Sequence, residues 1–303
     1  EFLPSLEALL REVGALKAVR DIIVASTKAK GEANKVLREQ MLKYSTDINL
    51  KECKMEDVTL EMIEEILAEK EKLLAKVRNL TEINPMLGHR GVRVGLAYPE
   101  IYEMQIRAIY EATAELLKKK VKAMPEIMVP QVCTKMEIRF VKEMQEKIKK
   151  EVEKKYGIEI KIKLGTMIEV VRACVRADTI AEVAEFFSFG TNDLTQATFS
   201  FSREDAENKF LPLYNKTGIL QDNPFEILDV QGVGRLMKIA VEYGRKTRPE
   251  LKVGICGEQG GEPRSIEYCH AVGLNYVSCS PFRIPIARLA AAHAKIKDVK
   301  MPF

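Results

Sequence analysis

The stretch that decides the fold class is FFSFGTNDLTQATFS, residues 186–200. Its first four residues are mostly aromatic and predict a short buried strand. Gly190 then turns the chain into three small polar residues, Thr191, Asn192 and Asp193. In α/β proteins, a hydrophobic strand that ends in polar groups places a site at its carboxyl end. The interpretation therefore depends on whether other strands of this chain end in the same way.

Five further runs have the same pattern, a short strand-like segment followed by Gly, Pro or polar residues. They are 91–98, 126–132, 162–171, 252–257 and 276–280. Helical patterns lie between them, at 99–119, 135–155, 234–246 and 285–297. Strands that alternate with helices predict a parallel sheet, because only a long crossover returns the chain for parallel pairing. Both a closed barrel and an open doubly wound sheet fit this order.

Two features favour the barrel. Neither the dinucleotide-binding nor the P-loop glycine motif occurs, and polar residues follow nearly all the predicted strands instead of one switch point. A complete (β/α)₈ TIM barrel has eight strands. We therefore predict a barrel of this type that lacks its first two strands in this chain, with residues 84–303 as the barrel domain.

Residues 1–83 are predicted to be a helical region inserted between barrel strands. In the stretch 58–80, apolar residues recur on one helix face, and Thr59 is a suitable N-cap. The apolar positions are Leu60, Ile63, Ile66, Leu67, Leu73, Leu74, Val77 and Leu80.

Composition narrows the classes of function. The net charge is +4, with 30% charged and 46% apolar residues, which gives no argument for a nucleic-acid partner. No apolar run is long enough for a membrane span, and no signal peptide is recognisable. The six cysteines form no C-x-x-C pair, so reduced thiols and a cytoplasmic location are expected. Because the chain begins at Glu1, we expect it to be a piece of a longer protein.

Two carboxylates stand at the ends of consecutive predicted strands. Glu169 follows one strand and Asp193 follows the next. Neighbouring parallel strands lie about 4.8 Å apart, so such carboxylates can hold one hard cation such as Mg²⁺. The alternative is a helix-capping Asp and a surface Glu.

Three other residues are candidates for a site. Arg90 lies between two glycines in GHRG and suits the binding of a carboxylate or phosphate. His89 is either a general acid or a hydrogen-bonded support, and we favour support. Cys279, between two serines at the end of the last strand, is either a chemical group or inert filler. Cys256 poses the same question, and we interpret it as a core residue.

Taken together, the segments NPMLGHRG, YPEIYEMQ, GTMIEV, FFSFGTNDLTQ, FSRED, GICGEQGGEP and YVSCSPFRIPIARLAAA resemble the C-terminal, pyruvate-binding domain of pyruvate phosphate dikinase. They come in the family's order and span about 220 residues, from residue 84 to near the end. The related barrels of phosphoenolpyruvate (PEP) synthase and of Enzyme I of the phosphotransferase system are less similar.

The resemblance implies that Glu169 and Asp193 bind Mg²⁺, and that Arg90, Gly190, Thr191 and Asn192 line the pocket for PEP or pyruvate. It implies that Cys279 gives a proton to the enolate methylene. A thiol, mostly protonated near neutral pH, can both give and retake a proton. The complete enzyme would also carry a phosphohistidine domain and an ATP-binding domain, and would be a homodimer.

The chain departs from the family pattern at several positions. Val171 replaces a proline, Gln259 a histidine and Val92 a cysteine, and MVPQVCT differs from the family's glycine-containing version. Of these departures, Gln259 and Gln131 are expected to lie near the mouth of the barrel, where they bear on substrate affinity. Two upstream strands, each carrying a substrate-binding arginine, are absent, so this piece by itself is expected to be incomplete. The alternatives are a PEP synthase or Enzyme I-like domain, a lyase acting through a pyruvate enolate, and a non-catalytic dimerisation module of this fold.

Overall fold

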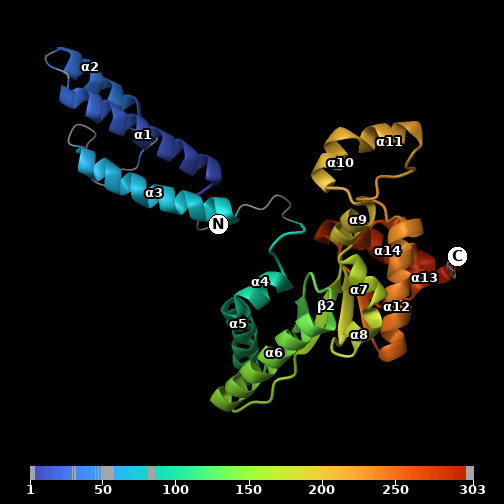
Figure 1. The fold of residues 1–303 in the computed structure, drawn as a ribbon. Helices are drawn as coiled ribbons and strands as arrows, with labels where there is room; N and C mark the ends of the chain where they lie inside the picture. Colours follow the sequence, from blue (N-terminus) through green and yellow to red (C-terminus); the bar gives the residue numbers. More distant parts are fainter. Residues whose placement is uncertain are drawn as a thin grey trace. The chain divides into compact units, whose positions relative to one another are not determined.

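The computed structural model describes residues 4–28, 30, 32–44, 46, 48, 58–80 and 86–297. Its contacts divide the chain into two compact units, residues 1–88 and 89–303, which are described separately below. The boundary expected between residues 83 and 84 lies outside the described residues, and so do the first two residues of NPMLGHRG. Figure 1 shows the fold as a ribbon.

The described residues of the first unit form the helices α1 (Leu6–Lys28), α2 (Glu32–Met41) and α3 (Leu60–Leu80), with a short 3₁₀ turn η1 (Leu42–Tyr44). Apolar residues spaced three or four apart on α1 and α3 face each other and form a core of their own. Thr59 Oγ1 accepts a hydrogen bond from the Met62 N–H at 3.3 Å, which confirms the predicted N-cap. The helical character predicted for this region is confirmed, although the side chain of Leu80 lies outside the described part. The buried residues of α1 and α3 in this core include Leu9, Val13, Leu16, Val19, Ile23, Ile63, Leu67, Leu74 and Val77.

Within the described ranges, the second unit is built on a parallel sheet of five strands, in the order β1-β2-β3-β4-β5. The strands are β1 (Glu126–Val129), β2 (Lys163–Ile168), β3 (Phe186–Phe189), β4 (Lys252–Ile255) and β5 (Tyr276–Val277). Every neighbouring pair is parallel, and Ile168 of β2 lies in register with Phe189 of β3. The carboxyl ends of all five strands therefore meet at one edge of the sheet.

Helices connect these strands and cover the sheet. Two short helices, α7 (Val171–Val175) and α8 (Ala177–Ala181), pack against α12 (Arg235–Thr247), beside the sheet in Figure 1. The other elements are α4 (Val92–Ala97), α5 (Pro99–Lys118), α6 (Lys135–Tyr156), α9 (Thr191–Phe199), α10 (Arg203–Lys209), α11 (Leu211–Thr217), η3 (Val230–Gly234), α12 (Arg235–Thr247), η4 (Glu258–Gly261), α13 (Pro263–Val272), η5 (Pro281–Arg283) and α14 (Ile284–Ile296). The predicted alternation of strands and helices, and the parallel sheet, are confirmed.

One predicted strand is wrong: the stretch 91–98 forms the helix α4. Its valines suggested alternation, but the buried residues are Val92 and Gly95, three apart as on a helix. The Gly95 N–H donates to the Gly91 carbonyl at 3.1 Å, and the Tyr102 ring packs where a side chain at position 95 would be. In the described residues the sheet therefore has five strands, with β1 and β5 at its edges, and it does not close into a barrel.

Two glycines in the sheet are covered by aromatic rings from the neighbouring strand. A Cβ at Gly165 would lie 2.5 Å from the ring of Phe186, and one at Gly254 would lie 2.1 Å from the ring of Tyr276. Each pair sits side by side across the sheet, because Gly254 is in register with Tyr276 and Thr166 with Phe187. The rings therefore fill the space that the glycines leave.

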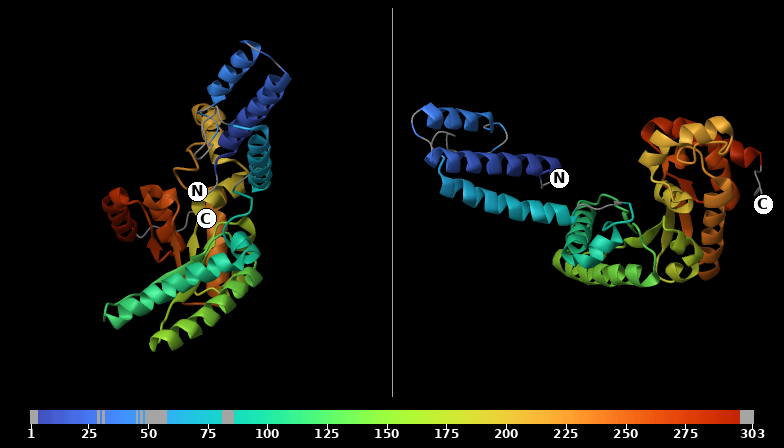
Figure 2. Two further views of the ribbon diagram at one scale, coloured as in Figure 1. Left: turned by 90° about the vertical axis from the view of Figure 1, so that its left-hand side faces the viewer. Right: turned by 45° about the horizontal axis from the view of Figure 1, so that its top comes forward.

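Helices α5 and α6 run in the same direction, joined by a ladder of three salt bridges, and Figure 2 shows them side by side. Each pair joins residues 44 positions apart: Glu103 with Lys147 at 3.5 Å, Arg107 with Glu151 at 2.5 Å, and Glu111 with Lys155 at 3.0 Å. The side chains are largely exposed, so each pair adds little stability.

Apolar side chains are exposed along η5 and α14 of the second unit. Phe282 is 93% exposed and Ile296 is 81% exposed, and Ile284, Ile286 and Leu289 are exposed between them. None of the helices in the described residues is long and apolar enough to cross a membrane.

Candidate functional site

Glu169 and Asp193 lie at the carboxyl ends of neighbouring strands. Glu169 follows β2 directly, and Asp193 lies in the first turn of α9, which follows β3. The Gly190 N–H donates to the Ile168 carbonyl at 3.2 Å and so fixes the end of β3 beside the end of β2. The carboxylates therefore meet at one edge of the sheet, where the parallel order places them.

Gln131 joins these two carboxylates. Its backbone N–H donates to Glu169 Oε1 at 2.7 Å, and its side-chain Nε2 donates to Asp193 Oδ2 at 2.5 Å. It lies two residues after the end of β1, the strand next to β2, and is 3% exposed. The sequence predicts Gln131 near the mouth of the barrel, as a departure from the family pattern, but assigns it no contact with the two carboxylates.

Arg90 brings a positive charge to the same place. Its Nη2 lies 3.4 Å from Asp193 Oδ2, and about half of its side chain is exposed. Beside it, His89 Nε2 lies 3.3 Å from the Arg93 carbonyl oxygen, and its ring packs on Tyr98 with centroids 5.7 Å apart. Arg90 therefore faces the carboxylate pair, while His89 contacts residues in and just after helix α4.

The environment of Glu169 disfavours its charged form. The pKa of this carboxyl is raised from 4.5 to about 7, chiefly by burial and also by the nearby charge of Asp193. The hydrogen bond from the Gln131 N–H and the charge of Arg90 oppose this shift. A buried carboxylate with an anionic neighbour is stabilised as an anion when a cation lies beside it.

Gly190 makes room for Glu169. A Cβ at position 190 would lie 2.3 Å from Glu169 Oε2 and 2.6 Å from Met167 Sδ, so a side chain there would displace the carboxylate. Two carboxylates on neighbouring strand ends are the donor set that Mg²⁺ takes from proteins, with water and substrate oxygens completing its shell. The residues present therefore fit a divalent cation held by Glu169 and Asp193.

Thr191 is turned to the interior at the start of α9. It is fully buried, and its Oγ1 donates to Gln259 Oε1 at 2.7 Å. Gln259 Nε2 in turn donates to the Pro224 carbonyl at 2.8 Å. Gln259, which stands where the family has histidine, thus ties the start of α9 to the 222–226 loop. The close approach of Gly257, whose Cβ would lie 1.9 Å from Thr191 Oγ1, completes this packing.

Asn192 and Cys279 line a second part of the site, a small pocket of about 270 Å³ at the ends of β4 and β5. Asn192 Oδ1 accepts from the Glu258 N–H at 3.1 Å. Arg283 at the pocket edge approaches the Glu258 carboxylate, with Nη1 and Oε2 3.7 Å apart. The remaining lining residues are Cys256, Gly257, Ser278 and Ser280.

Cys256 differs from the prediction that it is a core residue. It is half-buried and lines the same pocket as Cys279, with its Sγ 3.6 Å from the Phe189 carbonyl oxygen. Burial raises the pKa of the Cys256 thiol. The pocket therefore presents two cysteines, of which the sequence predicted one.

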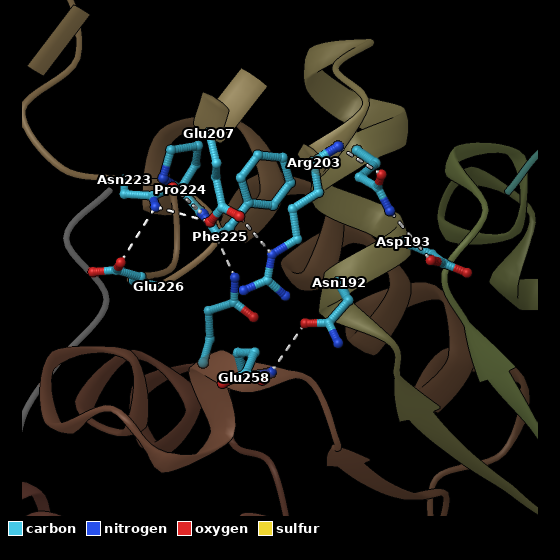
Figure 3. Close-up of polar contacts among 11 residues, drawn as sticks. Asn192, Asp193, Arg203, Glu207, Asn223, Pro224, Phe225, Glu226 and Glu258 are labelled. Carbon is cyan, nitrogen blue, oxygen red and sulfur yellow. Dashed lines mark hydrogen bonds and ion pairs between the residues drawn. The ribbon is translucent and has the colours of Figure 1, made fainter. Parts of the chain in front are cut away.

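A polar network supports the start of α9 from the side of α10, as Figure 3 shows. Gln196 Nε2 lies 3.5 Å from Asp193 Oδ1, and its Oε1 accepts from the Arg203 N–H at 3.0 Å. Arg203 continues to Glu207, with Nε and Oε2 3.3 Å apart, and its guanidinium lies 5.7 Å from the centroid of the Phe225 ring. The FSRED segment thus braces the helix that carries Asp193.

The sequence as a whole matches one protein family. Residues 26–296 match the family described as "PEP-utilising enzyme, PEP-binding domain". The match covers most of the chain, and the chain belongs to this family.

Three similar curated proteins are pyruvate, phosphate dikinases. That of Entamoeba histolytica is 59% identical over 232 residues, covering 76% of this chain and 26% of the relative. That of Clostridium symbiosum is 54% identical over 225 residues, 74% of this chain and 26% of the relative. The chloroplastic protein 1 of Arabidopsis thaliana is 52% identical over 247 residues, 82% of this chain and 26% of the relative. The chain thus spans about a quarter of the length of the curated relatives it matches.

Proposed function

We propose that this chain is the PEP- and pyruvate-binding catalytic domain of a pyruvate phosphate dikinase. One observation carries the proposal: Arg90, Glu169 and Asp193 converge at the carboxyl ends of β2 and β3. Asn192 and Cys279 line a pocket at the ends of the next strands of the same sheet edge. A cationic side chain, two carboxylates that can hold a metal ion, and a thiol that can give a proton suit the conversion of PEP to pyruvate.

In the proposed reaction, PEP gives its phosphoryl group to a histidine of another domain and leaves the enolate of pyruvate. Mg²⁺, held by Glu169 and Asp193, would neutralise the negative charge of substrate oxygens as the enolate forms. Arg90 would bind the anionic substrate beside Asp193, in place before the charge develops. Asn192 would hydrogen-bond a substrate oxygen at the pocket.

Cys279 would complete the reaction. Its S–H bond breaks and a C–H bond forms at the enolate methylene, which yields pyruvate and a thiolate. In the direction of PEP synthesis the thiolate retakes a proton from the methyl group of pyruvate. The position of Cys279 in the pocket with Asn192 supports this role.

The finer architecture belongs to the same proposal. We infer that the five parallel strands are part of a TIM-type barrel that closes with strands from outside this chain, and that the first unit is an insertion in that barrel. The edge positions of β1 and β5 support this inference. The complete enzyme would supply the phosphohistidine and ATP-binding domains, work in the cytoplasm and act as a homodimer.

Exchange of the methyl protons of pyruvate with D₂O tests the proposal in the complete enzyme, with Mg²⁺ and a suitable oxyanion present. Cys279→Ser should abolish exchange because a hydroxyl is far too weak an acid, while PEP binding should survive. Cys133→Ser is the matched control, since Cys133 is half-buried and contacts Glu137 instead of the pocket. Exchange that persists in Cys279→Ser would contradict the role of Cys279.

A further inference from the structure

Gln131 has an unusual backbone conformation for its residue type. Its φ is +60°, in the left-handed region, and only Lys120 and Ser200 share a positive φ among the non-glycine residues of the described ranges. A residue with a side chain is disfavoured there and persists only when its surroundings hold it. Gln131 is also almost fully buried, at 3% exposure. Such conformations cluster at functional sites.

The contacts of Gln131 account for this conformation. The left-handed turn points the backbone N–H at Glu169 Oε1 while the side-chain Nε2 reaches Asp193 Oδ2. The remaining side-chain atom, Oε1, lies 3.3 Å from Arg93 Nη2, which donates to it. One residue thus uses its backbone donor and both ends of its amide on three charged side chains.

Packing fixes the side chain in this position. Gly91, with φ +59°, lies directly against it, and a Cβ there would be 2.9 Å from both Cβ and Cγ of Gln131. The Val92 N–H donates to the Pro130 carbonyl at 3.2 Å and so locks the GHRG loop onto the same turn. The amide therefore has little freedom to leave the carboxylates.

We propose that Gln131 is a positioning residue that sets the separation of Glu169 and Asp193 for a divalent cation. It binds one oxygen of each carboxylate, Oε1 of Glu169 and Oδ2 of Asp193. The second oxygen of Asp193, Oδ1, has only a longer contact, at 3.5 Å, with Gln196 Nε2. In the absence of the cation, its donors offset the repulsion between the two anions. The inference rests on the proposed function, since it assigns a role toward the proposed metal site.

Calorimetric titration of the whole chain with Mn²⁺ tests this role, with Gln131→Leu and Gln131→Gly as the variants. Both keep the backbone N–H and remove the amide, and glycine also relieves the left-handed backbone. Hydrogen-bond partners of metal ligands typically contribute 10- to 100-fold to affinity, so both variants should bind Mn²⁺ about tenfold more weakly or worse. If Gln131 acts only through its backbone N–H, Gln131→Gly should bind Mn²⁺ with wild-type affinity.

Gln145→Leu is the matched control for lost stability. Gln145 is equally buried, and its Nε2 donates to Tyr110 Oη and the Ile162 carbonyl, outside the candidate site. This variant should lower the unfolding temperature without changing the Mn²⁺ affinity.

Two outcomes would overturn the inference at different levels. If the wild-type chain binds Mn²⁺ and Gln131→Leu or Gln131→Gly binds it as tightly or more tightly, the positioning role alone is refuted. If the wild-type chain binds no Mn²⁺, or Asp193→Ala binds it normally, the proposed metal site fails and the inference fails with it.

Discussion

At the scale of single residues, Glu169 is a buried carboxyl group whose charged form is disfavoured in the folded chain. It is 5% exposed, it lies beside Asp193, and its pKa is raised to about 7. The folded chain therefore holds a proton on this carboxyl more tightly than the unfolded chain does. A group of this kind stabilises the fold below its ordinary pKa and loses that contribution as the pH rises.

The pH dependence of stability follows from this difference. Without divalent metal, the free energy of unfolding should fall between about pH 4.5 and 7, by on the order of 3 kcal/mol for a pKa that moves from 4.5 to about 7. Glu169→Gln keeps an oxygen to accept from the Gln131 N–H but cannot ionise. Denaturant titrations in EDTA should find this variant more stable than wild type at pH 8 and similar at pH 4.5. Parallel curves for the two proteins would contradict the assignment.

The residues of the site were predictable from the sequence to different degrees. Glu169 and Asp193 could be placed together because consecutive strands of a parallel sheet end at one edge. Gln131 was predicted to lie near the mouth, but its role was not predictable, because it depends on a left-handed backbone and on hydrogen bonds to residues 38 and 62 positions away. No local pattern carries such information.

At the scale of elements, glycines in the two units meet opposite surroundings. Gly165 in β2 lies under the ring of the buried Phe186, whereas a Cβ at Gly14, in the middle of α1, would meet nothing within 4 Å. In a packed sheet an added methyl group must displace the ring, whereas on an open helix surface it only restricts the unfolded chain.

Alanine at these two glycines should therefore change stability in opposite directions. Gly165→Ala should destabilise the second unit by about 1–3 kcal/mol, because the Phe186 ring is 3% exposed and has little room to move. Gly14→Ala should stabilise the first unit by about 0.5–1 kcal/mol. Chemical denaturation followed by circular dichroism measures both. Equal signs for the two variants would show that the space around these glycines does not decide their effect.

The elements themselves were largely predictable, with one instructive exception. Long helices such as α3, α5 and α6 carry enough apolar repeats for the period to be clear. The eight residues 91–98 are too few to show a clear period, and the alternation of Val92 and Val94 suggested a strand. The helix α4 forms there because Gly91 begins it with a positive φ and Gly95 accepts the Tyr102 ring, and both effects depend on residues outside the stretch or on backbone geometry.

At the scale of the whole molecule, the chain consists of two units with separate cores. We expect scanning calorimetry to resolve two unfolding transitions, because each core can be lost without the other. Leu16→Ala should lower only the transition of the first unit, since Leu16 is fully buried in its core and such a deletion costs about 2–5 kcal/mol. A single transition that shifts as a whole in this variant would contradict the independence of the units.

The exposed apolar residues of α14 bear on self-association. The family resemblance implies a homodimer, and an exposed apolar surface such as that of α14 often marks a site of protein–protein contact. Sedimentation at micromolar concentration should give a mass above that of the 34.3 kDa monomer, and Leu289→Lys should reduce it. Leu213→Lys is a control of similar exposure on α11: Leu213 is 57% and Leu289 58% exposed. A clean wild-type monomer would count against the dimer.

The ladder between α5 and α6 has a consequence beyond its small energy. Its charges alternate in sign along each helix, in steps of four residues. If α6 slipped by one turn along α5, Arg107 would face Lys147 or Lys155, and Glu111 would face Glu151 in one of the two directions. The correct alignment matches every pair, and the nearest wrong one opposes like charges, which is penalised. The ladder therefore specifies the alignment of α5 and α6. Its main effect is to disfavour arrangements in which one helix is shifted by a turn.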